Sequence, residues 1–468
     1  TQERGTSMSE TSRAADDREN AGFQLENGVV QAVKTAVSEA DTVALSRLLK
    51  PLHPADIADL LEQVSDRERA KLLHFWAAEI DGEVLSEIDE ALREEVIAAM
   101  PESNLVEAVR DLDSDDVVDL VEDMEALQQG RILDALSAPE RAAVELTLTY
   151  PEFSAGRLMQ REVVRAPEHW SVGETIDFLR RDAEHLPEQF YHVILVDPRM
   201  RPVGYVTLGK LLSAARKVPL TQITEDSFRT VPVSQPEADV AYVFNQYHLI
   251  SVPVVDELDR LVGVVTIDDA MAVLDEEHEE DILRLAGVGD GSLSDRVLET
   301  TRQRLPWLAV NLVTAILASL VIAQFEATLQ QIVALAVLMP IVASMGGNAG
   351  TQTLTVAVRA IATKDLTGSN MMRVLRREVL VGLVNGCIFA VIMGAVGTVW
   401  FGAFALGYVI AAAMVVNLVV AGLAGIVVPV ALDRVGVDPA LASGAFVTTV
   451  TDIVGFFAFL GLAAVILV

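Results

Sequence analysis

The pattern of apolar and polar side chains predicts short helices over the first part of the chain. Residues 23–150 alternate apolar and polar positions at helical spacing and contain few β-branched runs. One helix is expected to have Pro54 in its first turn, and a similar pattern returns near residue 114, where Ser114 is a candidate N-cap. We therefore expect an acidic, solenoid-like α-helical domain over 23–150, after a disordered tail over 1–22.

A duplicated unit is expected over residues 151–270. The stretch 192–208 matches 251–267 at a shift of 59 positions, so that Asp197 and Gly204 correspond to Asp256 and Gly263. Each copy predicts a strand, an Asp-containing turn, a second strand and a helix, which makes an α/β unit. The duplication resembles a pair of cystathionine-β-synthase (CBS) domains, regulatory modules that commonly pack around a nucleotide-sized cleft.

An acid-rich helix is predicted next, at about 268–285, within a connecting segment over 271–304. Its acids include Asp269 and Asp275, and Glu277, Glu280 and Asp281 share one face by the i, i+3, i+4 rule. Like charges at this spacing destabilise an isolated helix by about a few tenths of a kcal/mol per pair. A bound divalent cation would offset this repulsion, and screening by solvent and salt is the alternative.

Residues 305–468 predict an all-α transmembrane domain of five helices. The apolar segments lie at about 306–329, 332–361, 378–401, 405–431 and 441–467, each long enough to cross a bilayer. The expected external turns carry Glu326 and no Lys or Arg, whereas the other connections carry the basic side chains Arg302, Arg304, Arg359, Lys364, Arg373, Arg376, Arg377 and Arg434. The positive-inside rule therefore predicts cytoplasmic N-terminal domains and an external C-terminus. Five spans are few for a pore, so we expect a homodimer with a pathway near the shared axis.

Charge divides the chain in the same way. The formal charge of −32 lies entirely in the first 304 residues, because residues 305–468 contain six acids and six Lys or Arg. This acidity argues against a nucleic-acid partner and against docking of the first part on anionic lipid head groups. It suits divalent cations, which bind hard carboxylate oxygens, although plain solubility of a large domain is the alternative.

The distribution of reactive side chains argues against an enzyme. Cys387 is the only cysteine, and all seven histidines precede residue 305, so the apolar half offers no His base and no Cys or His metal cluster. An intramembrane aspartyl protease would need a pair of deep carboxylates. The polar start of the chain has no apolar core of a signal peptide, so we expect the first part to stay in the cytoplasm.

Asp452 is the most informative residue of the apolar half, because it is the only charged side chain in 441–468. In a helix that begins at residue 441 it falls roughly 16 Å along the axis, near the middle of a bilayer about 30 Å thick. A charge at that depth costs at least roughly 2.5–3.5 kcal/mol and usually faces a bundle interior or a wet cavity. A cation pathway is one interpretation, and a protonated or hydrogen-bonded Asp that holds helices together is the other.

The glycine-rich stretch 346–353 in the second span offers related chemistry. Gly347 and its neighbouring glycines let helix backbones approach closely, while Asn348, Thr351 and Gln352 add polar groups that could hold a hydrated cation through its water. Alone, the stretch is as typical of tight helix packing as of a pore lining.

Together these parts resemble the MgtE family of magnesium channels and transporters. The matching elements are LHPADIADLLE in the acidic helical domain, the CBS pair, the acidic connecting helix and, in the five-span domain, GGNAGTQ, VDPAL and TDIVG. The resemblance implies a bacterial-type plasma-membrane homodimer whose pore is lined by the second and fifth spans. It also implies that the connecting helix plugs the cytoplasmic mouth when magnesium is plentiful.

The resemblance also implies the site residues and the function. The expected pore and selectivity residues are Asp452, Asn348, Gly347, Thr448, Thr449 and Thr451. The expected regulatory metal ligands are Glu277, Glu280, Asp281, Asp269, Asp275, Asp56 and Asp59. The implied function is Mg²⁺ uptake gated by intracellular Mg²⁺, with an ion-coupled divalent-cation exporter or a non-transporting CBS sensor as alternatives. ATP binding stays open, because Leu208, Gly209 and Lys210 stand where some relatives have an Arg-Asp pair.

Overall fold

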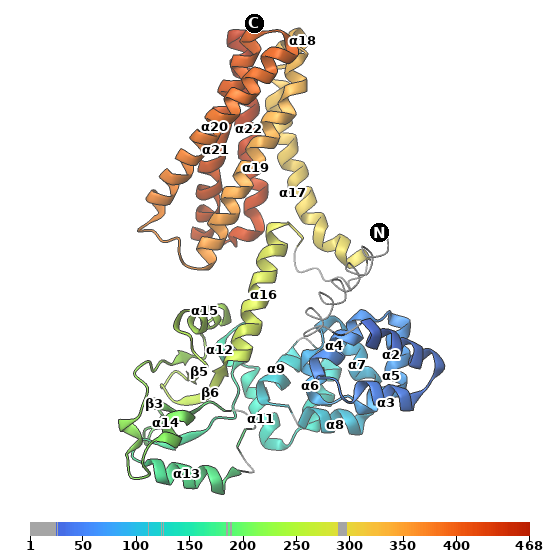
Figure 1. Cartoon of the computed structure of the whole chain (residues 1–468), viewed down its shortest axis with the longest axis vertical. Helices are drawn as coiled ribbons and strands as arrows, with labels where there is room; N and C mark the ends of the chain where they lie inside the picture. The colour runs from blue at the N-terminus through green and yellow to red at the C-terminus, as the bar shows by residue number, and fades with distance from the viewer. Residues whose placement is uncertain are drawn as a thin grey trace, which may run out of the picture. The chain divides into compact units, whose positions relative to one another are not determined.

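The computed structural model describes Leu25 and residues 27–110, 112–122, 124, 126–183, 186–187, 190–288 and 297–468. The chain divides into two compact units, of which one ends at Leu274 and the other begins at Asp275 (Figure 1). The predicted tail over 1–22 and residues 289–296 of the predicted connecting segment lie outside the described residues.

Short helices form the first part of the first unit, as the periodicity predicts. Their buried faces share one core that contains Leu45, Leu60, Leu85 and Leu120. Helix α4 begins at Pro54, as predicted, and His53 caps it. In order, the elements are α2 (Asn27–Glu39), α3 (Thr42–Leu49), α4 (Pro54–Gln63), α5 (Asp66–Trp76), η1 (Ala77–Glu79), α6 (Gly82–Glu87), α7 (Glu90–Ala99), α8 (Glu102–Arg110), α9 (Ser114–Glu122), α10 (Ala126–Ala135) and α11 (Ala138–Thr147).

Ser114 is not the N-cap of α9, because the helix begins at Ser114 itself. Its hydroxyl donates to Glu162 Oε2 at 2.8 Å and accepts from the Arg161 backbone N–H at 2.8 Å. The Ser114 side chain, predicted to cap its own helix, therefore bonds instead to residues distant in sequence, Glu162 and Arg161.

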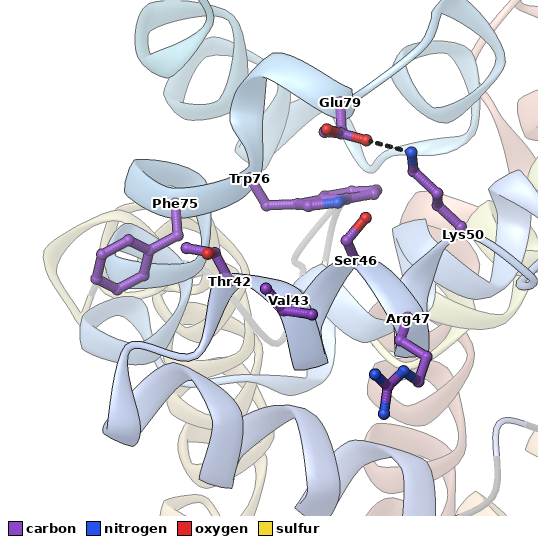
Figure 2. Close-up of a pocket in the computed structure, with 8 residues that line it drawn as sticks. All are labelled: Thr42, Val43, Ser46, Arg47, Lys50, Phe75, Trp76 and Glu79. Carbon is purple, nitrogen blue, oxygen red and sulfur yellow. Dashed lines mark ion pairs between the residues drawn. The ribbon is translucent and has the colours of Figure 1, made fainter.

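A groove of about 510 Å³ lies on this helical domain between α3 and the α5–η1 segment (Figure 2). The buried indole of Trp76 forms part of its wall, and Lys50 pairs with Glu79 at 3.1 Å across one end. Both charged side chains are largely exposed, so this ion pair contributes at most about 1 kcal/mol. The groove contains none of the predicted site residues.

Two small sheets form the CBS-like part and confirm the duplication. Each has a parallel pair followed by an antiparallel hairpin, with a register shift at Leu195/Val196 in one and at Val254/Val255 in the other. The elements are α12 (Ala155–Leu158), β1 (Arg165–Pro167), α13 (Val172–Arg181), β2 (His192–Val196), β3 (Pro202–Thr207), α14 (Leu208–Ser213), η3 (Leu220–Gln222), β4 (Val231–Pro232), α15 (Glu237–Tyr247), β5 (Ser251–Val255) and β6 (Leu261–Thr266).

The two hairpin turns are built in the same way. Asp197 accepts from the backbone N–H groups of Arg199 and Arg201, and Asp256 accepts from those two and four residues beyond it. Asx-type bonds of this kind explain why an aspartate recurs at the same place in each copy.

The second unit contains the remaining helices, and five of them are long and apolar enough to cross a membrane. The helices are α16 (Ile267–Leu285), whose last residues belong to this unit, α17 (Val297–Ala323), α18 (Glu326–Gln331), α19 (Ala334–Ala362), α20 (Met371–Phe401), α21 (Phe404–Arg434) and α22 (Pro439–Ile466).

Three of the predicted span boundaries are wrong, and one of them is the start of the first span, which lies at Thr300 and not near 306. The first span ends at Ala323 and not near 329, because the chain turns there and Phe325 packs edge-to-face on Phe457 with ring centroids 5.9 Å apart. The third helix begins at Met371 and not at 378. The first turns of this helix are charged, so the apolar pattern that predicted the span does not include them. They are helical all the same, because Arg, Met and Leu are good helix formers.

Glycines let the membrane helices pack closely around α21. A Cβ at Gly382 would lie 2.5 Å from the Leu418 carbonyl oxygen, and one at Gly422 would lie 2.7 Å from that of Glu378. These approaches bring α20 and α21 into backbone contact.

Candidate functional site

Asp452 lies about 20 Å along α22, counted from Pro439 at 1.5 Å per residue. The side chain is half-buried in the chain. Among the described residues, none donates a hydrogen bond to its carboxylate or forms an ion pair with it. Asp452 therefore does not hold helices together through a hydrogen bond within the described chain, and its oxygens remain available to an ion or to water.

The threonines beside Asp452 differ in what they can offer. The Thr448 and Thr449 side chains are part-exposed, and their hydroxyls donate to backbone carbonyls one turn earlier in α22. Thr451 is fully buried, and its methyl group lies on the side of α22 that faces Gly350. Thr451 is thus a packing residue in this structure, and its hydroxyl donates to the Thr448 carbonyl at 2.9 Å.

A polar face of α19 lies beside these residues. Ser344, Asn348, Thr351 and Thr355 are all exposed and follow helical spacing, and Asn348 Nδ2 donates to Ser344 Oγ at 3.3 Å. This face is the sequence-predicted pore motif, and its polar groups are not consumed by packing within the chain.

Gly347 joins the two helices at this level. A Cβ there would meet only Thr448, at 3.9 Å, so the two polar faces adjoin. Because α19 and α22 run antiparallel, Asp452 lies one turn beyond Thr448 at the level of Ser344. The structure therefore brings together Asp452, Thr448, Gly347 and the Asn348 face from two separate spans.

Asn417 is a residue that the sequence analysis missed. It is fully buried in α21, and its Nδ2 donates to the Val342 carbonyl at 2.8 Å. A Cβ at Gly346 or Gly455 would lie 2.2 or 2.8 Å from its amide nitrogen. Asn417 of α21 thus holds α19 and α22 together on their buried side, while their polar faces are on the exposed side. The sequence did contain a signal for it, because a lone asparagine in the apolar run MVVNLVV indicates a buried polar contact.

A cluster of acids lies where α16 approaches the start of α22. Arg284 pairs with Glu280 at 2.6 Å and with Asp438 at 3.1 Å. Burial raises the pKa of Glu277, helped by Glu280 and Asp281, and burial followed by Asp438 raises the pKa of Asp281. Arg284 lowers both pKa values and His278 lowers that of Asp281, yet both values stay raised, so a further positive charge at this cluster would be favourable.

The end of α16 also contacts the two polar-faced helices. Leu285 packs against a cluster that includes Leu354 and Val358 of α19 and Ala440 and Val447 of α22. The predicted plug helix thus ends against the cytoplasmic ends of the helices that carry the candidate pathway (Figure 1).

A second acid cluster lies in the first unit, between α9 and the start of α16. Burial, followed by Asp269 and other acids, raises the pKa of Asp116 to about 7. Burial also raises the pKa of Asp269 to about 6, helped by Asp268, and that of Asp115 well above its usual value. Only Asp269 was predicted. The sequence analysis did not single out Asp115 and Asp116, because the sequence does not show which distant carboxylates they meet.

The other predicted regulatory acids lie elsewhere. Asp56 accepts from the His53 backbone N–H at 3.4 Å and so helps to cap α4, while Asp59 and Asp275 are exposed. Over the part of the chain that the structure describes, no three His, Cys, Asp or Glu side chains converge as ready metal ligands. The clusters are therefore concentrations of charge that an ion would have to draw together.

Comparison with known proteins identifies the family of this chain. Family models match residues 339–462 ("Divalent cation transporter"), 52–153 ("MgtE intracellular N domain") and 155–217 with 220–276 ("CBS domain"). The magnesium transporter MgtE of Thermus thermophilus is 32% identical over 95% of this chain and 99% of its own length. That of Enterococcus faecalis is 34% identical over 69% of this chain and 72% of its own.

The chain belongs to the MgtE family. The predicted fold is confirmed: an MgtE N domain, a CBS pair and a five-helix apolar domain. This MgtE-family chain is a multi-pass membrane protein with cytosolic N-terminal domains. A solved structure of the cytosolic domain of the Mg²⁺ channel MgtE in complex with ATP is 32% identical, with a TM-score of 0.47, and it covers 52% of this chain and 99% of its own.

Proposed function

We propose that this chain carries Mg²⁺ into the cell through a pathway along the polar faces of α19 and α22, completed by the same faces of a second copy in a homodimer. The observation that carries the proposal is the Asp452 carboxylate, which lies deep in a membrane helix and lacks a partner among the described residues. A second copy would place two such carboxylates at one level.

The chemistry of Mg²⁺ suits this arrangement. The ion gives up its water reluctantly and prefers octahedral oxygen ligands, so a pathway that keeps its water shell avoids the cost of stripping it. Two Asp452 carboxylates match a charge of +2, and the low dielectric around them strengthens the attraction. Asn348 and Thr448 add dipoles that can bind the ion's waters. The pathway therefore favours a divalent over a monovalent cation.

We propose further that intracellular Mg²⁺ closes the pathway by binding the acid clusters. At low Mg²⁺ the carboxylates of each cluster repel one another: those around Asp116 in the first unit, and those around Asp281 in the second. A bound divalent ion offsets this repulsion and favours the compact arrangement, in which Leu285 lies against α19 and α22. The ion can act as a switch only if it binds this state more tightly than the open one.

Flux measurements on liposomes test the pathway. Asp452→Asn keeps the shape of the side chain and removes its charge, and it should leave little Mg²⁺ uptake, while Asp452→Ala should abolish it. Asp433→Asn, an exposed acid at the end of α21, is the matched control and should leave uptake unchanged. Normal uptake by both Asp452 variants would refute the proposal.

The same preparation separates the proposed channel from a coupled exporter. A channel passes Mg²⁺ down an imposed gradient with no coupling ion, and current should follow the gradient in either direction. If flux requires an opposing proton or sodium gradient, alternating access replaces the open pathway in this account.

A further inference from the structure

A groove of about 780 Å³ lies on α20 at its cytoplasmic end, away from the faces of α19 and α22 described above. Arg373, Arg376 and Arg377 line its first part at i, i+3 and i+4, so the three guanidinium groups share one face of the helix. Sequence analysis placed these arginines in a loop. The structure places them on the first turns of a membrane helix, and their common face follows from that.

The three arginines have no acidic partner within the part of the chain that the structure describes. Among the described residues, none forms an ion pair or hydrogen bond with their side chains. The acid nearest in sequence, Glu378, is directed elsewhere, because Thr353 of α19 donates to its carboxylate at 3.4 Å. Their position at the beginning of α20 adds to the electrostatic cost of the three positive charges, since cations are disfavoured at the positive end of a helix. The groove therefore has a concentrated and unmet demand for anionic charge.

The second part of the groove is apolar. Leu380, Val381 and Val384 continue the same face one and two turns further into the span, and 59%, 44% and 58% of each side chain is exposed. An inorganic anion would satisfy the arginines and leave this surface untouched. A molecule with a charged head and apolar chains would cover both.

We propose that this groove binds an anionic phospholipid of the cytoplasmic leaflet. The phosphate lies against Arg373, Arg376 and Arg377, and the first segments of the acyl chains lie on Leu380 and its apolar neighbours. Guanidinium groups suit the phosphate, because their planar fork can donate two parallel hydrogen bonds to it. The positive-inside rule explains why basic residues lie at this end of the span. It does not explain why three of them line one groove together with apolar side chains.

Basic residues at a membrane surface each contribute about 1 kcal/mol to the binding of anionic lipid, so loss of one arginine should weaken binding roughly fivefold and loss of all three roughly a hundredfold. The inference does not rest on Mg²⁺ transport, and the measurement below involves no flux.

Native mass spectrometry of the full chain in detergent, titrated with phosphatidylglycerol and with phosphatidylcholine, tests the proposal. The unmodified chain should retain phosphatidylglycerol at least tenfold more tightly, and Arg376→Gln should reduce this retention roughly fivefold. Arg302→Gln, at an exposed site near the start of α17, is the matched control and should bind as the unmodified chain does.

A second variant guards against misfolding. Replacing the three groove arginines by lysine keeps the positive charge that orients the span and removes the planar fork, so it should insert normally and bind phosphatidylglycerol several-fold more weakly. Equal retention of the two lipids by the unmodified chain would overturn the proposal. So would an unchanged affinity in both Arg376→Gln and the triple lysine variant.

Discussion

Replacing Asp116 by asparagine should stabilise the packing of α9 against the start of α16 at neutral pH. Asp116 has a pKa of about 7 in the folded chain and an ordinary value of 3.8, because burial and then Asp269 and other nearby acids disfavour its ionised form. Asparagine has nearly the same shape and no charge, so the substitution removes this penalty and leaves the packing intact.

The structure sets the size and the sign of the effect. Each pKa unit corresponds to about 1.4 kcal/mol, so ionisation of Asp116 costs the folded state about 4 kcal/mol at pH 7. Below pH 3.8 both states hold the proton and no penalty exists. As the pH rises toward 7 the unfolded chain ionises first, and stability falls. Because Asp115 and Asp269 share the repulsion, we expect the single variant to recover about 2–4 kcal/mol.

Hydrogen exchange of the full chain in detergent measures this directly, through peptides that cover α9. Without Mg²⁺ at pH 7, Asp116→Asn should exchange more slowly than the unmodified chain, and its response to added Mg²⁺ should be smaller. Glu107→Gln removes an exposed carboxylate of α8 and should change neither. The reasoning fails if the asparagine variant opens as readily as the unmodified chain and keeps the same dependence on pH and Mg²⁺.

The remaining predictions concern the second unit. Gly346→Ala should destabilise the membrane bundle by about 1–3 kcal/mol, because its Cβ would meet the Asn417 amide at 2.2 Å, whereas Gly368→Ala, with open space around it, should melt as the unmodified chain does in detergent. Arg284→Gln breaks the ion pair that ties the end of α16 to Asp438 at the start of α22, a part-exposed contact of the compact arrangement that contributes about 1 kcal/mol. The Mg²⁺ concentration that halves liposome flux should therefore rise roughly fivefold, and an unchanged or lower value would contradict the gating proposal.

Local patterns were enough for the elements and their order. The five apolar segments, the duplicated strand–turn–strand unit and the position of Asp452 along its helix follow from hydropathy, spacing and rise per residue, which depend only on neighbours along the chain. The errors lie at boundaries. The predicted third span begins only at 378, because charged residues precede that position. The helix itself begins at Met371, and its arginines share one face.

Partners that meet across the fold were beyond the reach of the sequence alone. It placed Asp116 and Asp269 on separate helices, gave no sign that burial together would raise their pKa values, and left Asn417 unmarked between Gly346 and Gly455. It could not show that Thr451 packs against α19 while Asp452, one residue later, has no hydrogen-bond or ion-pair partner among the described residues. Desolvation, repulsion and steric fit depend on which faces meet in space, and only the tertiary structure decides that.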